Sequence, residues 1–447
     1  MAVFANYHAQ LQTGHTGSIP EDSIEPLSGI PALDAVESTT EERREALART
    51  VVLKLNGGLG TSMGMNGPKS LVPVRAGLTF LDIVVGQLRS VRKQFDVDLP
   101  LLLMNSFATQ DATLAALERY PDLVVGDLPL DIVQNKEPKL TVDELAPVSW
   151  PADPDLEWCP PGHGDVYVSL FESGVLDQLR ERGFEYLFLS NIDNLGAVVD
   201  PDIAAWLRAE QVPYTAEVCE RTHNDRKGGH LAVRKSDGRI VLRDNGAVAP
   251  GEMDFFQDTE LHSTFHTNNL WVSIERLHDR LTATGGVLGL PMIANHKTVD
   301  PTDKTSTPVI QIESAMGSAI EVFEGARAIM TPRRRFRPVK TTNELLLLQS
   351  DLYTLTDSFE LEAQLEGEDP YVDLGPAYTF IDDFSARFAK GAPSLRDCTT
   401  LRLRGDITFG ADVRCVADVD VVADHRSVVP DGAVLTGSGA DVLEPAP

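Results

Sequence analysis

The sequence lacks the features that mark secreted, disulfide-bonded or membrane-spanning proteins. Its 447 residues contain only four cysteines, and because none lies in a C-x-x-C pair, neither a zinc site nor a disulfide framework is indicated. No apolar run approaches the roughly 18 residues that a membrane span requires, and the first residues show no basic-then-apolar signal pattern. These absences predict a cytoplasmic protein with no membrane partner.

Positive charge is also scarce. The chain has 39 Lys and Arg against 67 Asp and Glu, which gives a formal net charge of −28. An acidic molecule of this kind repels nucleic acid, so we expect no nucleic-acid partner. If the substrates are phosphates, the few clustered cations must make the site locally basic; the alternative for each of them is a solvated surface charge. The cations to consider first are Lys54, Lys69, Lys136, Lys139, Lys227 and those of the run 333–340.

Apolar runs that alternate with helical segments predict an α/β fold. Short buried strands separated by helices are typical of βαβ units around a mainly parallel sheet, and ligands of such sheets bind beyond the carboxyl ends of the strands. The expected strands of the sheet are 51–55, 99–104 and 184–189, with helices that begin at the caps Thr39 and Thr79. The expected elements after residue 211 are antiparallel strands at 214–220, 230–234, 239–243 and 265–274, and helices at 313–324 and 343–353.

The length predicts more than one domain. Residues 1–48 form an N-terminal extension with little regular structure before a final helix, residues 49–355 form the main domain, and residues 356–447 form a C-terminal domain. In this last domain two apolar series recur every six residues, which is the pattern of a parallel β-helix; an antiparallel sandwich is the alternative. The two series are Leu401, Ile407, Val413, Val419 and Leu403, Phe409, Cys415, Val421.

A glycine-rich loop follows the first predicted strand and ends at Lys69. Glycine lets backbone N–H groups approach an anion closely, so a strand that runs into such a loop suits the phosphates of a nucleotide. The loop is not a Walker loop, because Pro68 separates Gly67 from the lysine, and its glycine spacing does not match G-x-G-x-x-G. The alternative is a mobile loop without a ligand.

Three further segments carry polar side chains at positions where chemistry is expected. Asp193 follows the strand at 184–189, and a carboxylate there can hold Mg²⁺ against a phosphate, although a turn-forming Asp is the alternative. His163 lies between two glycines in a short loop, which suggests a phosphate or base contact or else a surface turn. Asn268 and Asn269 interrupt an apolar strand, so their amides either bond the backbone or face a ligand such as a sugar.

These strings, in this order, resemble the UDP-glucose pyrophosphorylases, the eukaryotic-type UTP–glucose-1-phosphate uridylyltransferases, over residues 51–353. The resemblance is carried by the glycine loop and by the strings at 160–165, 190–196, 227–229, 267–271, 311–317 and 338–342. It implies a Rossmann-like nucleotide-diphospho-sugar transferase domain with a mixed central sheet, and a C-terminal left-handed parallel β-helix through which relatives form homo-oligomers.

The resemblance also implies roles for individual residues. Lys69, Lys340 and Asp193 are the expected catalytic residues, and Asp193 is the expected ligand of the Mg²⁺ cofactor. The expected nucleotide-binding residues are Leu55, Asn56, Gly57, Gly58, Lys69, Gln134, Gly162, Asn191 and Asp193. The expected sugar-phosphate-binding residues are His163, Gly164, Glu217, Gly229, Asn268, Asn269 and Lys340.

The implied activity is reversible uridylyl transfer from UTP to glucose 1-phosphate, which gives UDP-glucose and pyrophosphate. The chain departs from the family pattern at His266, where the family often has Asn, and at 242–250, and it carries more arginine at 333–335 than expected. The first two departures lie on the presumed sugar side. Two alternatives therefore stay open: an enzyme that uses N-acetylglucosamine 1-phosphate or several sugar phosphates, and a nucleotide-sugar-binding protein without turnover.

Overall fold

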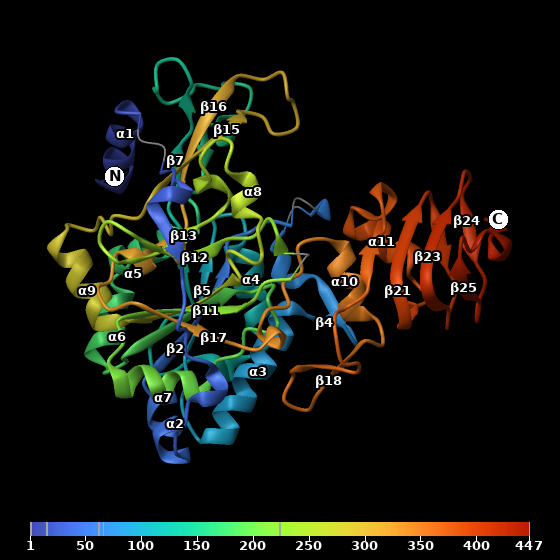
Figure 1. The fold of residues 1–447 in the computed structure, drawn as a ribbon, viewed down its shortest axis with the longest axis horizontal. Helices are drawn as coiled ribbons and strands as arrows, with labels where there is room; N and C mark the ends of the chain where they lie inside the picture. Colours follow the sequence, from blue (N-terminus) through green and yellow to red (C-terminus); the bar gives the residue numbers. More distant parts are fainter. Residues whose placement is uncertain (1, 15–16, 61–62, 66, 223–224, 447) are drawn as a thin grey trace.

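The computed structural model describes residues 2–14, 17–60, 63–65, 67–222 and 225–446, which form a mixed α/β fold (Figure 1). Its centre is a seven-stranded sheet with the order β17-β11-β14-β10-β2-β5-β6. These strands are β2 (Thr50–Asn56), β5 (Leu101–Asn105), β6 (Asp131–Val133), β10 (Tyr186–Asn191), β11 (Tyr214–Glu220), β14 (Thr264–Ser273) and β17 (Arg327–Met330).

Parallel and antiparallel pairs divide this sheet. Strands β10, β2, β5 and β6 pair in parallel, as the alternating pattern predicted, whereas β14 runs antiparallel to both β10 and β11. The mixed central sheet is therefore confirmed. In the register of β10 on β2, Asn191 stands opposite Leu55, so the glycine-rich loop and the turn that contains Asp193 leave the sheet side by side at its carboxyl edge.

Helices cover both faces of the sheet. Alternate residues of β2 face opposite sides: Val52 packs with α2, α3 and α7, and Leu53 with α5, α6 and α9. The predicted caps are confirmed, since Thr39 and Thr79 both form capping boxes. The helices are α2 (Thr40–Leu47), α3 (Phe80–Phe95), α4 (Gln110–Leu117), α5 (Val166–Glu172), α6 (Val175–Glu181), α7 (Pro201–Glu210), α8 (Met253–Phe256), α9 (Ile274–Ala283), α10 (Thr342–Gln349) and α11 (Ile381–Arg387).

Two small sheets border the carboxyl edge of the central sheet. One has the order β1-β12-β13 and the other the order β15-β16-β8. Their strands are β1 (Ile24–Pro26), β12 (His230–Arg234), β13 (Ile240–Arg243), β8 (Leu140–Thr141), β15 (Met292–Thr298) and β16 (Pro308–Ser314). Short two-stranded pairs are β3 (Pro73–Arg75) with β4 (Leu78–Thr79), β7 (Glu137–Pro138) with β9 (Trp158–Cys159), and β18 (Tyr353–Leu355) with β19 (Leu361–Ala363).

Two predicted elements are wrong. The helix expected at 313–324 does not form, because β16 runs to Ser314 and only a 3-10 turn, Met316–Glu321, follows it. The N-terminal extension is more regular than expected: Ala2–Gln12 forms α1 and β1 pairs with β12. Tyr7 of α1 is buried in a cluster with residues of β15 and β16, so contacts far away in sequence stabilise this helix.

The C-terminal strands form a separate lobe at one end of the molecule (Figure 1). Strands β20-β21-β23-β25 pair in parallel, and so do β22 and β24, so the antiparallel sandwich is wrong. Leu401 pairs with Val419 and Val419 with Gly437, which stacks residues three six-residue repeats apart, and every member of both apolar series is buried. The strands are β20 (Tyr371–Asp373), β21 (Ser394–Arg404), β22 (Ile407–Phe409), β23 (Arg414–Val422), β24 (Ser427–Val429), β25 (Val434–Gly437) and β26 (Glu444–Pro445).

Across the residues that the structure describes, none of the helices combines the length and the apolar character that crossing a bilayer requires.

Candidate active site

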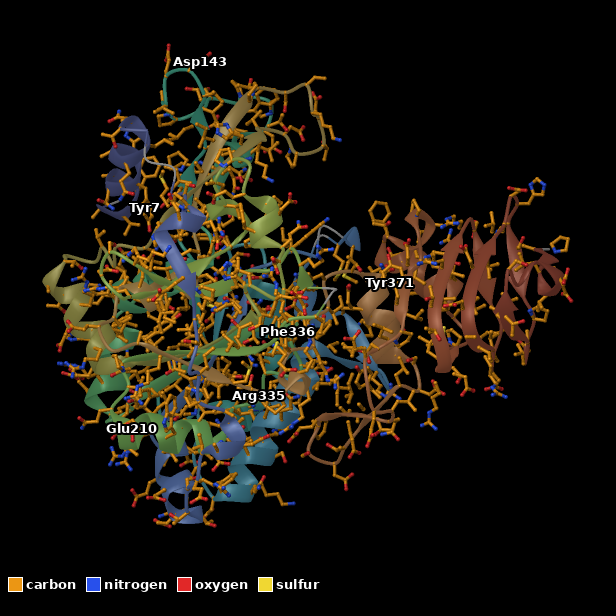
Figure 2. The ribbon with its side chains drawn as sticks, in the orientation of Figure 1. Tyr7, Asp143, Glu210, Arg335, Phe336 and Tyr371 are labelled. Carbon is orange, nitrogen blue, oxygen red and sulfur yellow. The ribbon has the colours of Figure 1, made fainter. Side chains whose placement is uncertain are left out.

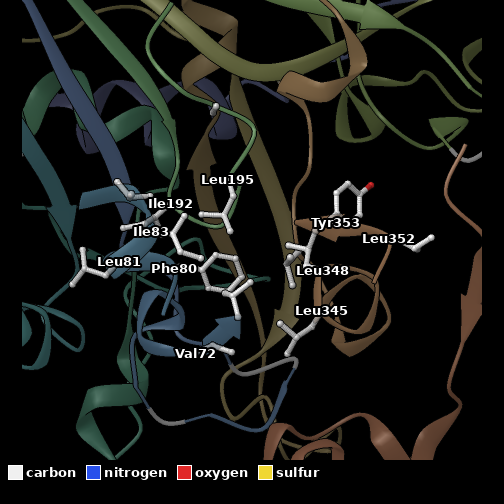
Figure 3. Packing of buried hydrophobic residues seen from close by; sticks show 14 of the residues in the cluster. Val72, Phe80, Leu81, Ile83, Ile192, Leu195, Leu345, Leu348, Leu352 and Tyr353 are labelled. Carbon is white, nitrogen blue, oxygen red and sulfur yellow. The ribbon is translucent and has the colours of Figure 1, made fainter. Parts of the chain in front are cut away.

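One hydrophobic cluster holds together the three chain segments that carry the predicted catalytic residues. Figure 3 shows Val72, Ile192, Leu195 and Leu345 packing around Phe80 of α3. Val72 follows the 3-10 turn that begins at Lys69, the two residues of the second segment flank Asp193, and Leu345 lies in α10, whose cap directly follows Lys340. Core packing therefore fixes these segments next to one another.

Direct polar contacts join the same segments. Lys69 Nζ lies 2.7 Å from Asp193 Oδ2 and also donates to the carbonyl of Val339. The Val339 N–H donates back to the carbonyl of Asp193 at 3.2 Å, and Lys340 is the next residue. The Lys69 and Asp193 side chains remain partly accessible, at 16% and 19% exposure. The structure thus brings together two predicted catalytic side chains and the segment that carries the third.

The Asp193 carboxylate fits a magnesium ion that arrives with a phosphate ligand. Mg²⁺ is usually held by one or two carboxylates together with phosphate oxygens and water. Asp193 offers one partly accessible carboxylate at a strand end, and the described residues contain no group of three or more His, Cys, Asp or Glu that could hold a metal by themselves. The donor set suits a metal shared with a triphosphate, and not an all-protein site.

The glycine-rich loop lies beside Gln134, which follows β6. A Cβ built on Gly57 would stand 3.0 Å from Gln134 Oε1, whereas a Cβ on Gly58 would have no heavy atom within 4 Å. The Lys69 N–H donates to the carbonyl of Gly58 at 3.4 Å, so the two ends of the loop meet. Its residues Thr61, Ser62 and Asn66 lie outside the described residues. Gly57, Gly58, Gln134 and the backbone of Lys69 therefore lie next to one another.

Leu55 and Asn56 end β2 next to this loop, but the Asn56 side chain serves the fold. Its Nδ2 donates to Asn105 Oδ1 at 2.7 Å and to Thr113 Oγ1 at 2.9 Å, and the residue is 2% exposed. The amide nitrogen of Asn56 is therefore used inside the sheet and does not point to a ligand.

The loop around His163 packs against the end of β16. A Cβ on Gly162 would stand 2.5 Å from the carbonyl oxygen of Ser314, and a Cβ on Gly164 would stand 2.4 Å from Ser314 Oγ. Gly162 also has a φ of 79°, which glycine adopts without strain. Both positions therefore require glycine for packing, in addition to any contact with a ligand.

The His163 side chain reaches the surface, but its ring is surrounded by protein atoms and is neutral. Its Nδ1 accepts the N–H of Met316 at 2.9 Å, which leaves the ring proton on Nε2. Desolvation by the surrounding protein lowers the pKa of His163 to about 4. At neutral pH this side chain can therefore donate one hydrogen bond from Nε2 but adds no charge to the site.

The predicted sugar-side amides divide into two groups. Asn268 adopts a φ of 61° where the register of β11 and β14 shifts, and its Nδ2 lies 3.4 Å from Asn191 Oδ1. Both side chains are partly accessible. Asn269 is fully buried, and its Nδ2 donates to Glu217 Oε2 and to the carbonyl of Arg335. Asn268 and Asn191 can meet a ligand, whereas the Asn269 amide belongs to the interior.

Glu217 lies in a closed ion pair, and not at an accessible surface as the sugar-binding role requires. Arg335 donates from Nε to Oε2 at 2.6 Å and from Nη2 to Oε1 at 2.7 Å. Trp271 Nε1 donates to Oε1 at 3.0 Å, and the Glu217 side chain has no exposed surface. The structure therefore gives Glu217 a bonded role in the interior, and its partner Arg335 was not anticipated.

The other cations named from the sequence mostly bond within the protein. Lys54 is buried and donates to Ser190 Oγ at 2.8 Å and to the Ala197 carbonyl at 2.6 Å, and burial lowers its pKa to about 7. Lys139 is buried and donates to the Val299 carbonyl. Arg333 donates to both carboxylate oxygens of Asp225. Two of the three arginines that seemed in excess at 333–335, Arg333 and Arg335, are thus used to fix their own segment.

The glycine-rich loop, the pair of Lys69 and Asp193 and the loop of His163 meet at the carboxyl edge of a mixed sheet, where ligands of such folds bind. A family model described as UTP–glucose-1-phosphate uridylyltransferase matches residues 1–415. The chain belongs to this family, as its motifs predicted.

Individual relatives and solved structures agree with this placement. The UTP–glucose-1-phosphate uridylyltransferase of Solanum tuberosum is 40% identical over 423 residues, which cover 93% of this chain and 84% of the relative. A mutant UDP-glucose pyrophosphorylase from Leishmania major in complex with UDP-glucose is similar with a TM-score of 0.89 at 40% identity, over 97% of this chain and 94% of that one. A UDP-glucose phosphorylase from Trypanosoma brucei is similar with a TM-score of 0.88 at 43% identity, over 97% and 94% of the two chains.

Proposed function

We infer that the chain is a UTP–glucose-1-phosphate uridylyltransferase, which converts UTP and glucose 1-phosphate reversibly into UDP-glucose and pyrophosphate. Family membership supports the reaction, and the similar Leishmania major structure holds UDP-glucose. The observation that carries the inference in this chain is the contact of Lys69 with Asp193 and Val339 beside the glycine loop. It gathers scarce positive charge where a triphosphate would lie, in a molecule of net charge −28.

The reaction needs charge stabilisation and alignment more than covalent chemistry. The phosphate oxygen of the sugar phosphate attacks the α-phosphorus of UTP in line, the bond to the bridging oxygen breaks, and pyrophosphate leaves opposite. Lys69 and Lys340 stabilise the charge that develops on the phosphoryl oxygens. Magnesium bound at Asp193 and to the phosphates would neutralise part of the same charge. The two reactants lie next to each other because the segments of Lys69, Asp193 and Lys340 are in contact.

The remaining residues divide between the two substrates. On the nucleotide side we assign Leu55, Gly57, Gly58, Gln134, Gly162 and Asn191, with Asn56 acting through its backbone. On the sugar side we assign His163, Gly164, Gly229 and Asn268, with Lys340 at the phosphate. Asn269 and Glu217 support these residues from the interior, since their side chains bond to each other and to Arg335.

The test is pyrophosphate release from UTP and Mg²⁺ with one sugar phosphate at a time. Glucose 1-phosphate is expected to give the highest kcat/KM, and N-acetylglucosamine 1-phosphate and galactose 1-phosphate much lower values. If kcat/KM for N-acetylglucosamine 1-phosphate is equal or higher, glucose is not the preferred sugar. Binding of UDP-glucose without pyrophosphate release from any of the three would refute the enzyme and leave a nucleotide-sugar-binding protein.

Three further proposals concern the C-terminal lobe and the setting of the enzyme. We propose that residues 356–447 form a left-handed parallel β-helix, because parallel strands stack at a spacing of three six-residue repeats. We also propose that the enzyme forms homo-oligomers through this lobe and works in the cytoplasm with its four cysteines reduced. Right-handed coils in an experimental structure would refute the first proposal. A monomer at every concentration in sedimentation velocity would refute the second, and localisation to another compartment would refute the third.

A further inference from the structure

His266 lies where the segments of the sugar side meet. Its backbone N–H donates to the carbonyl of Gly229 at 2.9 Å, and it stands two residues before Asn268 in β14. A Cβ built on Gly317 would stand 2.6 Å from His266 Cε1 and 3.0 Å from Nε2. The residue before Gly317, Met316, holds His163 through its N–H. His266 therefore neighbours three residues assigned to the sugar phosphate, although neither the motifs nor the proposed reaction gave it a role.

The His266 ring is enclosed and yet incompletely hydrogen-bonded. The residue is 7% exposed, and within the described part of the chain its Nε2 has no hydrogen-bond partner. Two other polar side chains of β14 are satisfied: Trp271 donates to Glu217, and Thr267 donates to the Glu217 carbonyl. Buried polar atoms normally have a partner. The ring packs so closely against Gly317 that any side chain there would clash with it. A buried imidazole nitrogen that lies among residues of the sugar side, with no partner in the described chain, points to a partner that is not part of the protein.

The state of the ring selects the kind of partner. Burial and the nearby His163 lower the pKa of His266 to about 3, so at neutral pH the ring has one N–H donor and one acceptor nitrogen. A phosphate oxygen is best met by a charged donor, whereas a sugar hydroxyl both donates and accepts and matches a neutral imidazole.

We propose that His266 is a specificity residue of the sugar side, and that its Nε2 makes a hydrogen bond with one ring hydroxyl of the bound glucose 1-phosphate. This inference rests on the proposed function and deepens it, because it names a contact that selects the sugar. The hydroxyl gives Nε2 the hydrogen-bond partner that the described residues do not supply. Substrates without that hydroxyl leave the nitrogen buried and unpaired.

The test combines variants with glucose 1-phosphate analogues that each lack one hydroxyl. His266→Phe removes the polar atoms and keeps an aromatic ring, and His266→Gln keeps a polar side chain. In His266→Phe the KM for glucose 1-phosphate is expected to rise about three- to tenfold, the size of one neutral hydrogen bond, with the KM for UTP unchanged. The wild type should have a higher KM for the analogue that lacks the bonded hydroxyl than for glucose 1-phosphate. His266→Phe should lose this difference and keep the wild-type differences for the other analogues. His266→Gln should restore part of it.

His230→Phe is the matched control. His230 is also buried in a strand, with both ring nitrogens unpaired among the described residues, but it stacks on His262 at 3.8 Å between ring centroids. Its replacement is expected to leave the sugar KM and the analogue pattern unchanged. Calorimetric binding of UDP-glucose and of UDP gives a second readout: His266→Phe should weaken the first about three- to tenfold and leave the second unchanged.

Several outcomes would overturn the inference. If His266→Phe changes every analogue equally, or if His266→Phe and His230→Phe act alike, then His266 only packs. If the variants bind UDP-glucose as tightly as the wild type, the partner of Nε2 is not the sugar. Absence of wild-type pyrophosphate release with any sugar phosphate would refute the proposed function instead. If His266→Phe does not fold, His266→Gln with the same analogues decides the question.

Discussion

Two ion pairs at the same edge of the sheet differ in how completely they are bonded. The pair of Lys69 and Asp193 is partly accessible, at 16% and 19% side-chain exposure. The pair of Arg335 and Glu217 is 7% and 0% exposed, and Trp271 also donates to the carboxylate. A fully bonded, buried carboxylate has nothing left to offer a ligand, whereas an accessible pair can exchange its partner for a phosphate. Accessibility therefore distinguishes residues that support the site from residues that can contact a ligand, and residue type does not.

The buried, closed pair of Arg335 and Glu217 supports the accessible, open pair of Lys69 and Asp193. The carbonyl of Arg335 accepts from Asn194 and Asn269, and the N–H of Arg337 donates to Asn194 Oδ1 at 2.8 Å. These bonds fix the chain that continues to Val339, whose carbonyl accepts from Lys69. Figure 2 places Arg335 and Phe336 inside the body of the molecule, on the side that faces the C-terminal lobe. The buried arginine therefore positions the segment that brings Lys340 to the site.

The largest effect is expected from breaking the closed pair. Glu217→Ala leaves the Arg335 guanidinium buried without its carboxylate, which should lower the free energy of unfolding by about 3–5 kcal/mol. The shift of the urea midpoint measures this. The double variant Glu217→Leu with Arg335→Met should recover most of the loss, because it removes both charges. A loss under about 1 kcal/mol in Glu217→Ala, the range of exposed pairs, would show that the pair is not closed in solution.

Breaking the open pair should affect catalysis instead of stability. Lys69→Ala is expected to reduce kcat on the order of 10²–10³-fold, as for the loss of one preorganised charge contact. Its urea midpoint should move little, since accessible ion pairs contribute about 0–1 kcal/mol. Lys93→Ala, at an exposed position of α3, is the matched control and should keep full activity. Turnover within tenfold of the wild type in Lys69→Ala would remove the lysine from the mechanism.

The same contrast explains how far the sequence could predict this molecule. The caps at Thr39 and Thr79, the strands expected at 51–55 and 184–189, and the burial of the six-residue repeats all follow from local patterns, and the structure has each of them within one or two residues. Asp193 was recognisable because it follows a strand. The buried, bonded state of Glu217 could not be predicted, because it depends on Arg335, which lies 118 residues away in the chain. The helix α1 was missed for the same reason, because its burial depends on β15 and β16.

Two glycines extend the comparison to the backbone. A Cβ on Gly164 would stand 2.4 Å from Ser314 Oγ and 2.8 Å from Leu290 Cδ1, whereas a Cβ on Gly58 would meet nothing within 4 Å. Gly164→Ala should therefore cost about 1–3 kcal/mol through overpacking. Gly58→Ala should leave the urea midpoint unchanged but raise the KM for UTP, because its methyl group would occupy the side where the nucleotide approaches. An unchanged KM for UTP in Gly58→Ala would move the nucleotide away from this loop.

The last effect concerns His266, which is buried like Glu217 but has an unpaired nitrogen, and it should appear only as a pH dependence of stability. Its folded pKa of about 3 lies below the ordinary value of 6.5, so between these values the unfolded chain binds a proton that the folded protein excludes. The free energy of unfolding should therefore fall as the pH falls below 6.5, and His266 should contribute up to about 1.4 kcal/mol per pH unit. His266→Asn removes this term, so the stability advantage of the wild type over the variant should shrink from pH 6.5 to 4.5 and stay constant above pH 7.5. If the difference in unfolding free energy between the wild type and His266→Asn does not depend on pH, the ring is protonated in the folded protein as readily as in the unfolded chain. The assignment of a neutral imidazole to the sugar side would then be wrong.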